Sequence, residues 1–398
     1  MSSPLLEHTP STEWRLWEKV GLGLIPPVDA IKTALSQRRW RFLAVDINGS
    51  CHYGCFFCES NNYYKGKVLL TDSEQEDLFR KLGELGEAAG TVVSLAGLEP
   101  LASPVVARKI PKLVRLLGQR QVVGLITAGK NLAEFSGLVA DNIDFINISL
   151  DGPQSTHDTV RGEGAFNSAS AGIEALLRRG FPADRIVPSS VACQNTWNQL
   201  PELWDCLKTR LGLTRFAANL VEADTQASWE ALLSPKDACS LADEAIKSSH
   251  AVSIGISPRS LTDCGGFWAE IARGHSPLNN RFTYDALGFP IIPLTDRVSL
   301  RLVYSHLIYG KIAKIDATGE ILVRHEDLTE RVRVPLSNLA RTNFEELSAA
   351  MTAPSALLIN TLGQTTESIC LGSEWHPLCL GSSLGCRTQK KEALCQPS

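Results

Sequence analysis

Three cysteines lie close together near the start of this 398-residue chain: Cys51, Cys55 and Cys58, spaced C-x3-C-x2-C, directly after the apolar run 42–47. Thiolates are the usual ligands of iron–sulfur clusters, and a closed 4Fe-4S cluster takes four of them. Three thiolates would therefore leave one position open, and an open position distinguishes reactive from structural metal sites. The spacing alone also fits half of a zinc site or a fragment of a ferredoxin-like site.

The elements that must position these cysteines are read from the pattern of apolar residues. β-rich runs alternate with helix-period segments from residue 41 onward, at 42–47, 92–95, 122–126, 145–148, 186–192 and 216–221. Such alternation with continuous apolar strands predicts a parallel sheet covered by helices. Six units in a row predict an α/β fold of the partial (β/α)6 TIM-like barrel type, whose chemistry lies on the loops after the strands. The cysteine loop follows the first strand and so lies at that end.

Further motifs follow the next expected strands in order. The second strand ends in Ser94–Pro100, the third in Thr127–Asn131, and the fourth in Asn147–Pro153, which continues through His157 and Arg161 to Phe166. With the cysteine motif, this order resembles the radical S-adenosylmethionine (SAM) superfamily, and in particular its branch with a SPASM or twitch extension. The resemblance covers residues 41–225 well and the C-terminal third loosely. Ala96 and Leu98 depart from the Gly-Gly-Glu-Pro motif of that family.

The resemblance implies a set of cofactor contacts. Cys51, Cys55 and Cys58 would hold three irons of a 4Fe-4S cluster, and the amino and carboxylate groups of SAM would take the fourth iron. The residues implied to contact SAM are Phe57, Gly97, Glu99, Thr127, Ser149, Asp151 and Arg161. Thr127 fits equally well as the cap of a helix-entry turn. Asp151 could equally bind substrate or cap the following turn.

The chain is expected to divide into four parts. These are a helical leader (1–40), the radical SAM core (41–225), a connecting helical and irregular segment (226–310) and a SPASM/twitch-like C-terminal region (311–398). The connecting segment is expected to contain a helix at 235–247, followed by irregular sequence to about residue 300. The last part is expected to begin with a β-hairpin over 311–323.

The cysteines of the C-terminal region suggest a second metal centre. In relatives with such an extension, a hairpin and a group of cysteines hold auxiliary 4Fe-4S clusters. Here Arg324 stands where a cysteine is expected, and the available ligands are Cys370, Cys379, Cys386 and Cys395. They could hold one auxiliary cluster, bind zinc or be free thiols. Cys264 is a candidate for a missing ligand or a hydrogen-atom donor.

Composition excludes several other classes of protein. The chain is 44% hydrophobic and 21% charged, with a net charge of -4 and no basic tract, so no nucleic-acid partner is expected. No run approaches the roughly 20 apolar residues of a membrane span. We expect a cytoplasmic protein, whose 11 cysteines serve as metal ligands or free thiols.

The expected activity follows from the resemblance. It implies a radical SAM oxidoreductase or maturase that takes one electron from a donor such as flavodoxin or ferredoxin and cleaves SAM to a 5′-deoxyadenosyl radical. That radical would abstract a hydrogen atom from a C–H bond of a peptide or natural-product precursor, giving cross-linking, epimerisation or oxidation. A small sugar, aminocyclitol or nucleoside is the alternative substrate. A non-catalytic iron–sulfur or zinc-binding redox protein is the alternative from another class.

Overall fold

The computed structural model describes most of the chain between residues 42 and 338. The described residues are 42–58, 63–89, 92–118, 121–222, 226–257, 260–261, 267, 271, 283–284, 290–302, 312–325 and 332–338. The expected helical leader at 1–40, Cys264 and the cysteines from Cys370 onward lie outside the described residues. No helix in the described ranges is long and apolar enough to cross a membrane.

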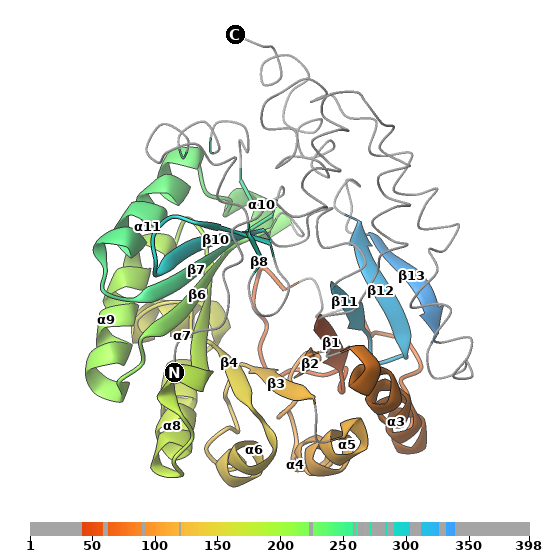
Figure 1. Cartoon of the computed structure of the whole chain (residues 1–398). Coiled ribbons are helices and arrows are strands. Elements are labelled where there is room, and N and C mark those ends of the chain that lie inside the picture. Colours follow the sequence, from red (N-terminus) through yellow and green to blue (C-terminus); the bar gives the residue numbers. More distant parts are fainter. Residues whose placement is uncertain are drawn as a thin grey trace, which may run out of the picture.

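One curved sheet of 13 strands organises the described part of the chain, in the order β13-β12-β11-β1-β2-β3-β4-β5-β6-β7-β10-β9-β8 (Figure 1). Its parallel centre consists of β1 (Phe42–Asp46), β2 (Val92–Ala96), β3 (Val122–Thr127), β4 (Phe145–Ser149), β5 (Ile186–Ala192), β6 (Arg215–Leu220) and β7 (Ala251–Ile256). Strands β10 (Val298–Leu302) and β11 (Ile312–Ile315) extend this parallel run at its two ends. The outermost strands are antiparallel: β8 (Thr283–Tyr284), β9 (Pro290–Pro293), β12 (Glu320–His325) and β13 (Val332–Asn338).

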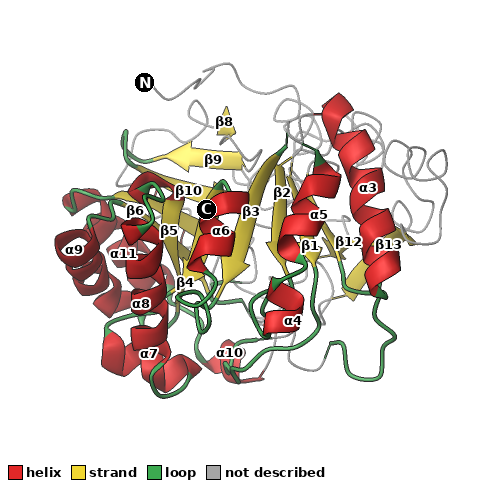
Figure 2. Ribbon diagram, turned by 90° about the horizontal axis from the view of Figure 1, so that it is seen from below, coloured by secondary structure: helices red, strands yellow, loops and turns green. Residues whose placement is uncertain are grey.

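Helices cover the outer face of the parallel centre (Figure 2). The longer ones are α3 (Asp72–Ala89), α5 (Ile110–Leu117), α6 (Ser136–Asn142), α7 (Gln154–Arg161), α8 (Ala165–Arg178), α9 (Leu200–Leu211) and α11 (Pro235–Lys247). The short ones are α4 (Pro104–Ala107), α10 (Gln226–Glu230), η2 (Ala183–Arg185) and η3 (Trp197–Gln199). Because side chains alternate along a strand, Leu43 and Val45 of β1 both face this layer and share one buried core with Phe79 of α3.

The opposite face of the sheet carries small polar side chains. Ser149 pairs in register with Ser189, Ser189 with Ala217, Ala217 with Ser253, and Ser253 with Ser299. The four serines are half-buried, and they alternate with residues that face the helices. A row of hydroxyl groups therefore crosses β4, β5, β7 and β10 on the inner face.

Most of the predicted elements are confirmed. The six expected strands form within one or two residues of their predicted ends, and α11 has the predicted bounds. The parallel, helix-covered sheet confirms the predicted α/β barrel-like class. The hairpin predicted at 311–323 forms as β11 and β12, and β11 pairs in parallel with β1.

The expectation of irregular sequence between α11 and residue 300 is wrong. Strands β7 and β10 form there and continue the parallel sheet beyond β6. Ser253 and Gly255 weaken the intrinsic strand propensity of β7, since small and flexible residues are poor strand formers. Pairing with β6 on one side and β10 on the other decides its conformation, and this pairing cannot be read from local sequence.

Candidate functional site

The cysteine loop lies at the carboxyl edge of the sheet, directly after β1. Cys55 is buried, Cys51 and Cys58 are half-buried, and all three are free thiols. The amide of Cys58 donates to the carbonyl of Cys55 at 3.0 Å, which folds the end of the motif into a turn. The predicted position of the motif is therefore confirmed.

The loop after β2 supports the segment that leads to Cys51. Gly97 has a φ of +115°, and a Cβ added there would lie 2.5 Å from the carbonyl oxygen of Asn48. Only glycine tolerates both this backbone conformation and so close an approach. Asn48 also accepts a hydrogen bond from the Leu98 amide at 3.3 Å and donates from Nδ2 to the Glu99 carbonyl at 3.0 Å. Gly97 is therefore required by the contact between the two loops.

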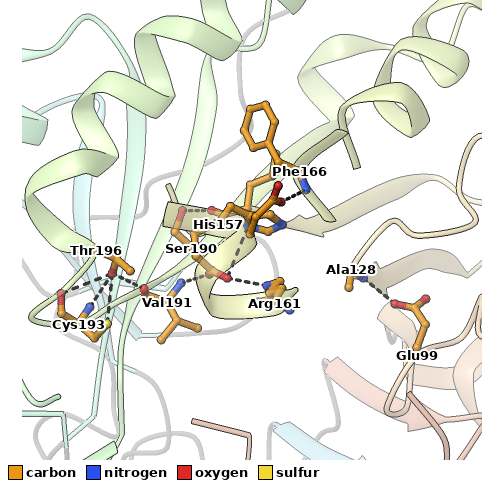
Figure 3. Close-up of polar contacts among 12 residues, drawn as sticks. Glu99, Ala128, His157, Arg161, Phe166, Ser190, Val191, Cys193 and Thr196 are labelled. Atoms are coloured by element: carbon orange, nitrogen blue, oxygen red, sulfur yellow. Dashed lines mark hydrogen bonds and ion pairs between the residues drawn. The ribbon is translucent and has the colours of Figure 1, made fainter. Parts of the chain in front are cut away.

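Glu99 connects the loops that follow β2 and β3. It is 1% exposed, and its Oε1 accepts from the Leu101 amide at 2.9 Å and from the Thr127 hydroxyl at 2.6 Å. Its Oε2 accepts from the Ala128 amide at 2.7 Å (Figure 3). Burial raises the pKa of Glu99, and these three hydrogen bonds oppose the rise. Both oxygens already bind protein donors, so contacts of Glu99 and Thr127 with SAM stay predictions.

Asp151 joins the ends of β4 and β5 to α7. This fully buried carboxylate accepts from the Val191 amide at 2.8 Å through Oδ1 and from Arg161 Nε at 2.5 Å through Oδ2. Burial opposes the charge on Arg161, but Asp151 and then Cys55 more than compensate and raise the pKa of Arg161. Arg161 is therefore a fixed cation.

The guanidinium group of Arg161 faces the cysteine loop. Its Cζ lies 5.7 Å from the centroid of the Phe57 ring, within the range of a cation–π contact. Burial raises the pKa of Cys55 to about 11, and the positive charge of Arg161 opposes that rise. Arg161 is thus a source of positive potential beside a loop whose function would require thiolates.

A buried histidine of α7 completes this network. His157 is fully buried, and its Nδ1 accepts a hydrogen bond from the Asp151 amide at 3.0 Å, which places the ring proton on Nε2. Burial lowers the pKa of His157 to about 4. The ring of His157 (labelled in Figure 3) therefore lies beside Asp151 as a neutral group.

The three thiolates of the cysteine loop fit the ligand set of a 4Fe-4S cluster. Within the described ranges, no three His, Cys, Asp or Glu side chains come together in a way that could hold one metal ion. In a 4Fe-4S cluster each thiolate binds a different iron, so the sulfur atoms need not meet at one point. The donor set, the partial burial of the loop and the adjacent Arg161 all fit a cluster with three protein ligands.

Sequence reasoning missed three polar residues, Asp46, Tyr64 and Lys314, whose contacts join the segments on either side of the cysteine loop to the hairpin of β11 and β12. The Tyr64 hydroxyl donates to Asp46 Oδ2 and accepts from the Ala317 amide at 3.1 Å. Lys314 Nζ lies 2.8 Å from the same oxygen of Asp46. The ring of Tyr64 packs on Gly49, where an added Cβ would lie 3.2 Å from Cγ. A charged residue, Asp46, at the end of an apolar strand is a local sign of such contacts. Its partner Lys314 is far away in the sequence, so local sequence could not identify it.

The predicted cofactor contacts gather at one edge of the sheet. Phe57, Gly97 and Arg161 lie on or against the cysteine loop, while Glu99, Thr127 and Asp151 hold the neighbouring loops in place. Ser149 ends β4 on the inner face and is half-buried. Their contacts with SAM remain predictions. The predicted contributions of Cys264 and of the late cysteines fall outside the described residues.

Known structures share this architecture. The chain is similar to anSMEcpe with bound AdoMet, with a TM-score of 0.55 and 16% identity over 89% of this chain and 92% of that one. It is similar to anSMEcpe with bound AdoMet and the Cp18Cys peptide, with a TM-score of 0.54 and 17% identity over the same shares. It is also similar to SuiB of Streptococcus suis bound to S-adenosylmethionine, with a TM-score of 0.58 and 13% identity over 90% of this chain and 78% of that one. At these identities the likeness establishes the fold alone.

Fold and site together define a parallel α/β barrel-like protein with a cysteine loop after its first strand. Residues 45–189 match the family model described as the radical SAM superfamily. This part of the chain is a radical SAM domain, as its motifs predicted, and the SPASM/twitch-like branch stays a prediction. No curated protein matches the sequence.

Proposed function

We propose that the chain is a radical SAM enzyme that acts on a peptide or another natural-product precursor. When bound, a reduced 4Fe-4S cluster supplies one electron for the cleavage of SAM, and the 5′-deoxyadenosyl radical so formed takes a hydrogen atom from a substrate C–H bond. This proposal rests on one observation: the cysteine loop, Phe57 and the largely buried cation Arg161 lie together at one edge of a radical SAM domain.

The chain's own residues would bind and orient the cofactors. Cys51, Cys55 and Cys58 would hold the cluster, and Arg161 would pair with the SAM carboxylate, since a guanidinium fork matches a carboxylate. Phe57 would lie against the adenine. Asp151 would keep Arg161 charged and correctly directed through its hydrogen bond to Nε.

A peptide substrate is supported by one structural relative, because the anSMEcpe structure contains a bound peptide as well as AdoMet. The row of hydroxyl groups on the inner face suits a substrate rich in hydrogen-bonding groups. It would equally suit a small sugar, an aminocyclitol or a nucleoside, which is the second candidate class. The reaction could be a cross-linking, an epimerisation or an oxidation.

The remaining parts of the proposal concern the C-terminal region and the electron supply. Cys370, Cys379, Cys386 and Cys395 would hold a second 4Fe-4S cluster in a SPASM/twitch-like region. A cytoplasmic carrier such as flavodoxin or ferredoxin would supply the electron.

Anaerobic product analysis tests the central proposal. The protein would be reconstituted with iron and sulfide, reduced with dithionite and given SAM, and 5′-deoxyadenosine would be measured by liquid chromatography. We expect product from the wild type and from Cys206→Ala, which alters a half-buried cysteine of α9. We expect none from Cys55→Ala. Absence of product in the wild type, or undiminished product from Cys55→Ala, would refute the proposal.

A further inference from the structure

An exposed turn projects from the protein beside the cysteine loop. The amide of Lys67 donates to the carbonyl of Tyr64 at 3.1 Å, and Gly66 has a φ of +77°. A positive φ at the third position is what a type II β-turn requires. The turn therefore holds Lys65 and Lys67 outward in a defined geometry.

The turn and the residues after it form a small surface that is both apolar and basic. Val68 is 86% exposed, the highest value among the large apolar residues that the structure describes, and Leu69 is 36% exposed. Lys65 and Lys67 are both exposed. Lys67 Nζ lies 3.4 Å from the centroid of the Tyr63 ring, and no described carboxylate forms an ion pair with either lysine. We call Lys65, Lys67, Val68 and Leu69 the 65–69 patch.

The 65–69 patch is packed against the segment that leads to the first cysteine. An added Cβ on Gly49, two residues before Cys51, would lie 2.8 Å from Leu69 Cδ1. The Leu70 amide donates to the carbonyl of Ala317 at 2.9 Å, which ties the end of the patch to the C-terminal hairpin. The patch is thus a fixed surface next to the cysteine loop.

We propose that the 65–69 patch is the docking surface for an acidic one-electron carrier protein that reduces the cluster. This inference rests on the proposed function, which requires one external electron for each cleavage of SAM. The carrier would lose one electron and the cluster would gain it, and docking itself would make or break no covalent bond.

Charge and size both favour this partner. The chain has a net charge of -4, so an acidic carrier is repelled by the molecule as a whole. It is attracted to a local pair of lysines with which no carboxylate of the described residues forms an ion pair. An exposed apolar centre with a charged rim is the usual anatomy of a protein interface. Electron-transfer complexes are weak and lie at the small end of interface sizes, so the 65–69 patch would form the centre of such an interface and not the whole of it.

Comparison of two reductants provides the test. The reconstituted full-length enzyme would be driven either by reduced flavodoxin or by dithionite, which needs no docking surface. In Lys65→Glu/Lys67→Glu and in Val68→Glu, we expect flavodoxin-driven formation of 5′-deoxyadenosine to fall about tenfold, because charge reversal converts attraction into repulsion. The dithionite-driven rate should stay within about twofold of the wild type. The flavodoxin-driven rate of the wild type should fall with added salt, and the rate of the double variant should not.

A matched control variant changes two exposed residues at the amino-terminal edge of the parallel strands, opposite the edge that carries the cysteine loop. Val122 begins β3 and is 45% exposed, and Arg185 is an exposed cation just before β5. Val122→Glu/Arg185→Glu should therefore leave both rates unchanged. The neutral variants Lys65→Gln/Lys67→Gln and Val68→Ser would serve if a charge reversal impaired folding.

The affinity of flavodoxin for the enzyme, measured by calorimetry, tests docking without turnover. An affinity or a flavodoxin-driven rate that is unchanged by Lys65→Glu/Lys67→Glu would overturn the docking proposal. Wild-type protein that forms no 5′-deoxyadenosine even with dithionite would instead refute the proposed function. In that case calorimetry alone would decide the docking surface, with unchanged affinity overturning it and about tenfold weaker affinity supporting it.

Discussion

At the scale of single residues, the buried carboxylates of the candidate site, Asp151 and Glu99, are already hydrogen-bonded to other groups of the protein. Asp151 fixes Arg161 and the Val191 amide, and Glu99 fixes Thr127 and two backbone amides. A buried carboxylate is tolerated only when donors surround it. The loops around the cysteines are therefore held in place by groups whose removal should affect stability as well as cofactor binding.

Glu99→Gln should destabilise the protein although it preserves the shape of the side chain. The amide nitrogen of glutamine would face a backbone amide in place of an acceptor oxygen, and an unsatisfied buried donor costs about 1–3 kcal/mol. Urea denaturation of the metal-free protein would measure the change in the free energy of unfolding. Glu134→Gln, which alters an exposed carboxylate, is the control. Equal stability of Glu99→Gln and wild type would contradict the role assigned to Glu99.

His157 should make stability depend on pH. Its pKa is about 4 in the folded protein, against an ordinary value of 6.5, because burial disfavours the charged ring. Between these two values the unfolded chain binds a proton that the folded chain does not, so stability is lost as the pH falls through this window. The slope is up to about 1.4 kcal/mol per pH unit from this one group.

His157→Asn would test that slope, since the amide oxygen can replace Nδ1 as the acceptor for the Asp151 amide but does not titrate. The free energy of unfolding of the metal-free protein would be measured at several pH values between about 4.5 and 7, the range in which the histidine titrates. As the pH falls, the variant should lose less stability than the wild type. Parallel curves for wild type and variant would show that His157 does not carry the effect.

At the scale of elements, the C-terminal hairpin is part of the support of the cysteine loop. Strand β11 pairs with β1, and the turn that follows it meets Tyr64 through the Ala317 amide. The Tyr63 hydroxyl donates to Asp316 in the same turn at 2.8 Å. Two residues that follow the cysteine motif thus bind a hairpin that lies about 250 positions later in the sequence.

Tyr64→Phe should loosen the cysteine loop. The ring would still pack on Gly49, but the hydrogen bonds to Asp46 and from the Ala317 amide would be lost, at a cost of about 1–3 kcal/mol. We expect reconstituted Tyr64→Phe to lose iron to a chelator several times faster than the wild type. Asp144→Ala is the matched control, because it removes a hydrogen bond from the Val123 amide at the opposite end of the sheet. Equal rates of iron loss in Tyr64→Phe and wild type would contradict this role of the hairpin.

At the scale of the whole molecule, the parallel sheet continues beyond the six predicted units on both sides. Strands β7 and β10 extend it after β6, and β11 extends it before β1. The exposed edges of β1 and β6 that a six-strand unit would leave are therefore paired. The family match at 45–189 covers only the centre of this larger sheet.

Iron content of the full-length chain tests the proposed second cluster. The triple variant Cys370→Ala/Cys379→Ala/Cys386→Ala should contain about four fewer irons than the wild type after reconstitution, because it would lack three ligands of one 4Fe-4S cluster. Cys206→Ala/Cys239→Ala is the control and should retain the full content. Unchanged iron in the triple variant would remove the second cluster from the proposal.

The sequence by itself determined the class of fold, the position of the cysteine loop and the superfamily. These depend on local signals: apolar runs of strand length, helix-period segments between them, and short motifs at the strand ends. Periodicity indicated six strands and one helix close to their observed bounds. Gly97, Glu99, Thr127, Asp151 and Arg161 were singled out from motifs at the expected strand ends.

Only the tertiary structure decided what those residues contact and where the sheet ends. Ser253 and Gly255 gave β7 a weak local signal, so its conformation depends on pairing with β6 and β10. The contacts among Asp46, Tyr64 and Lys314 join residues that are distant in the chain, and no periodic pattern in the sequence predicts such contacts. Gly97 and Glu99 lie after β2, and the partners seen in the structure are protein groups, because buried polar atoms must be satisfied within the fold. Their contacts with SAM stay predictions.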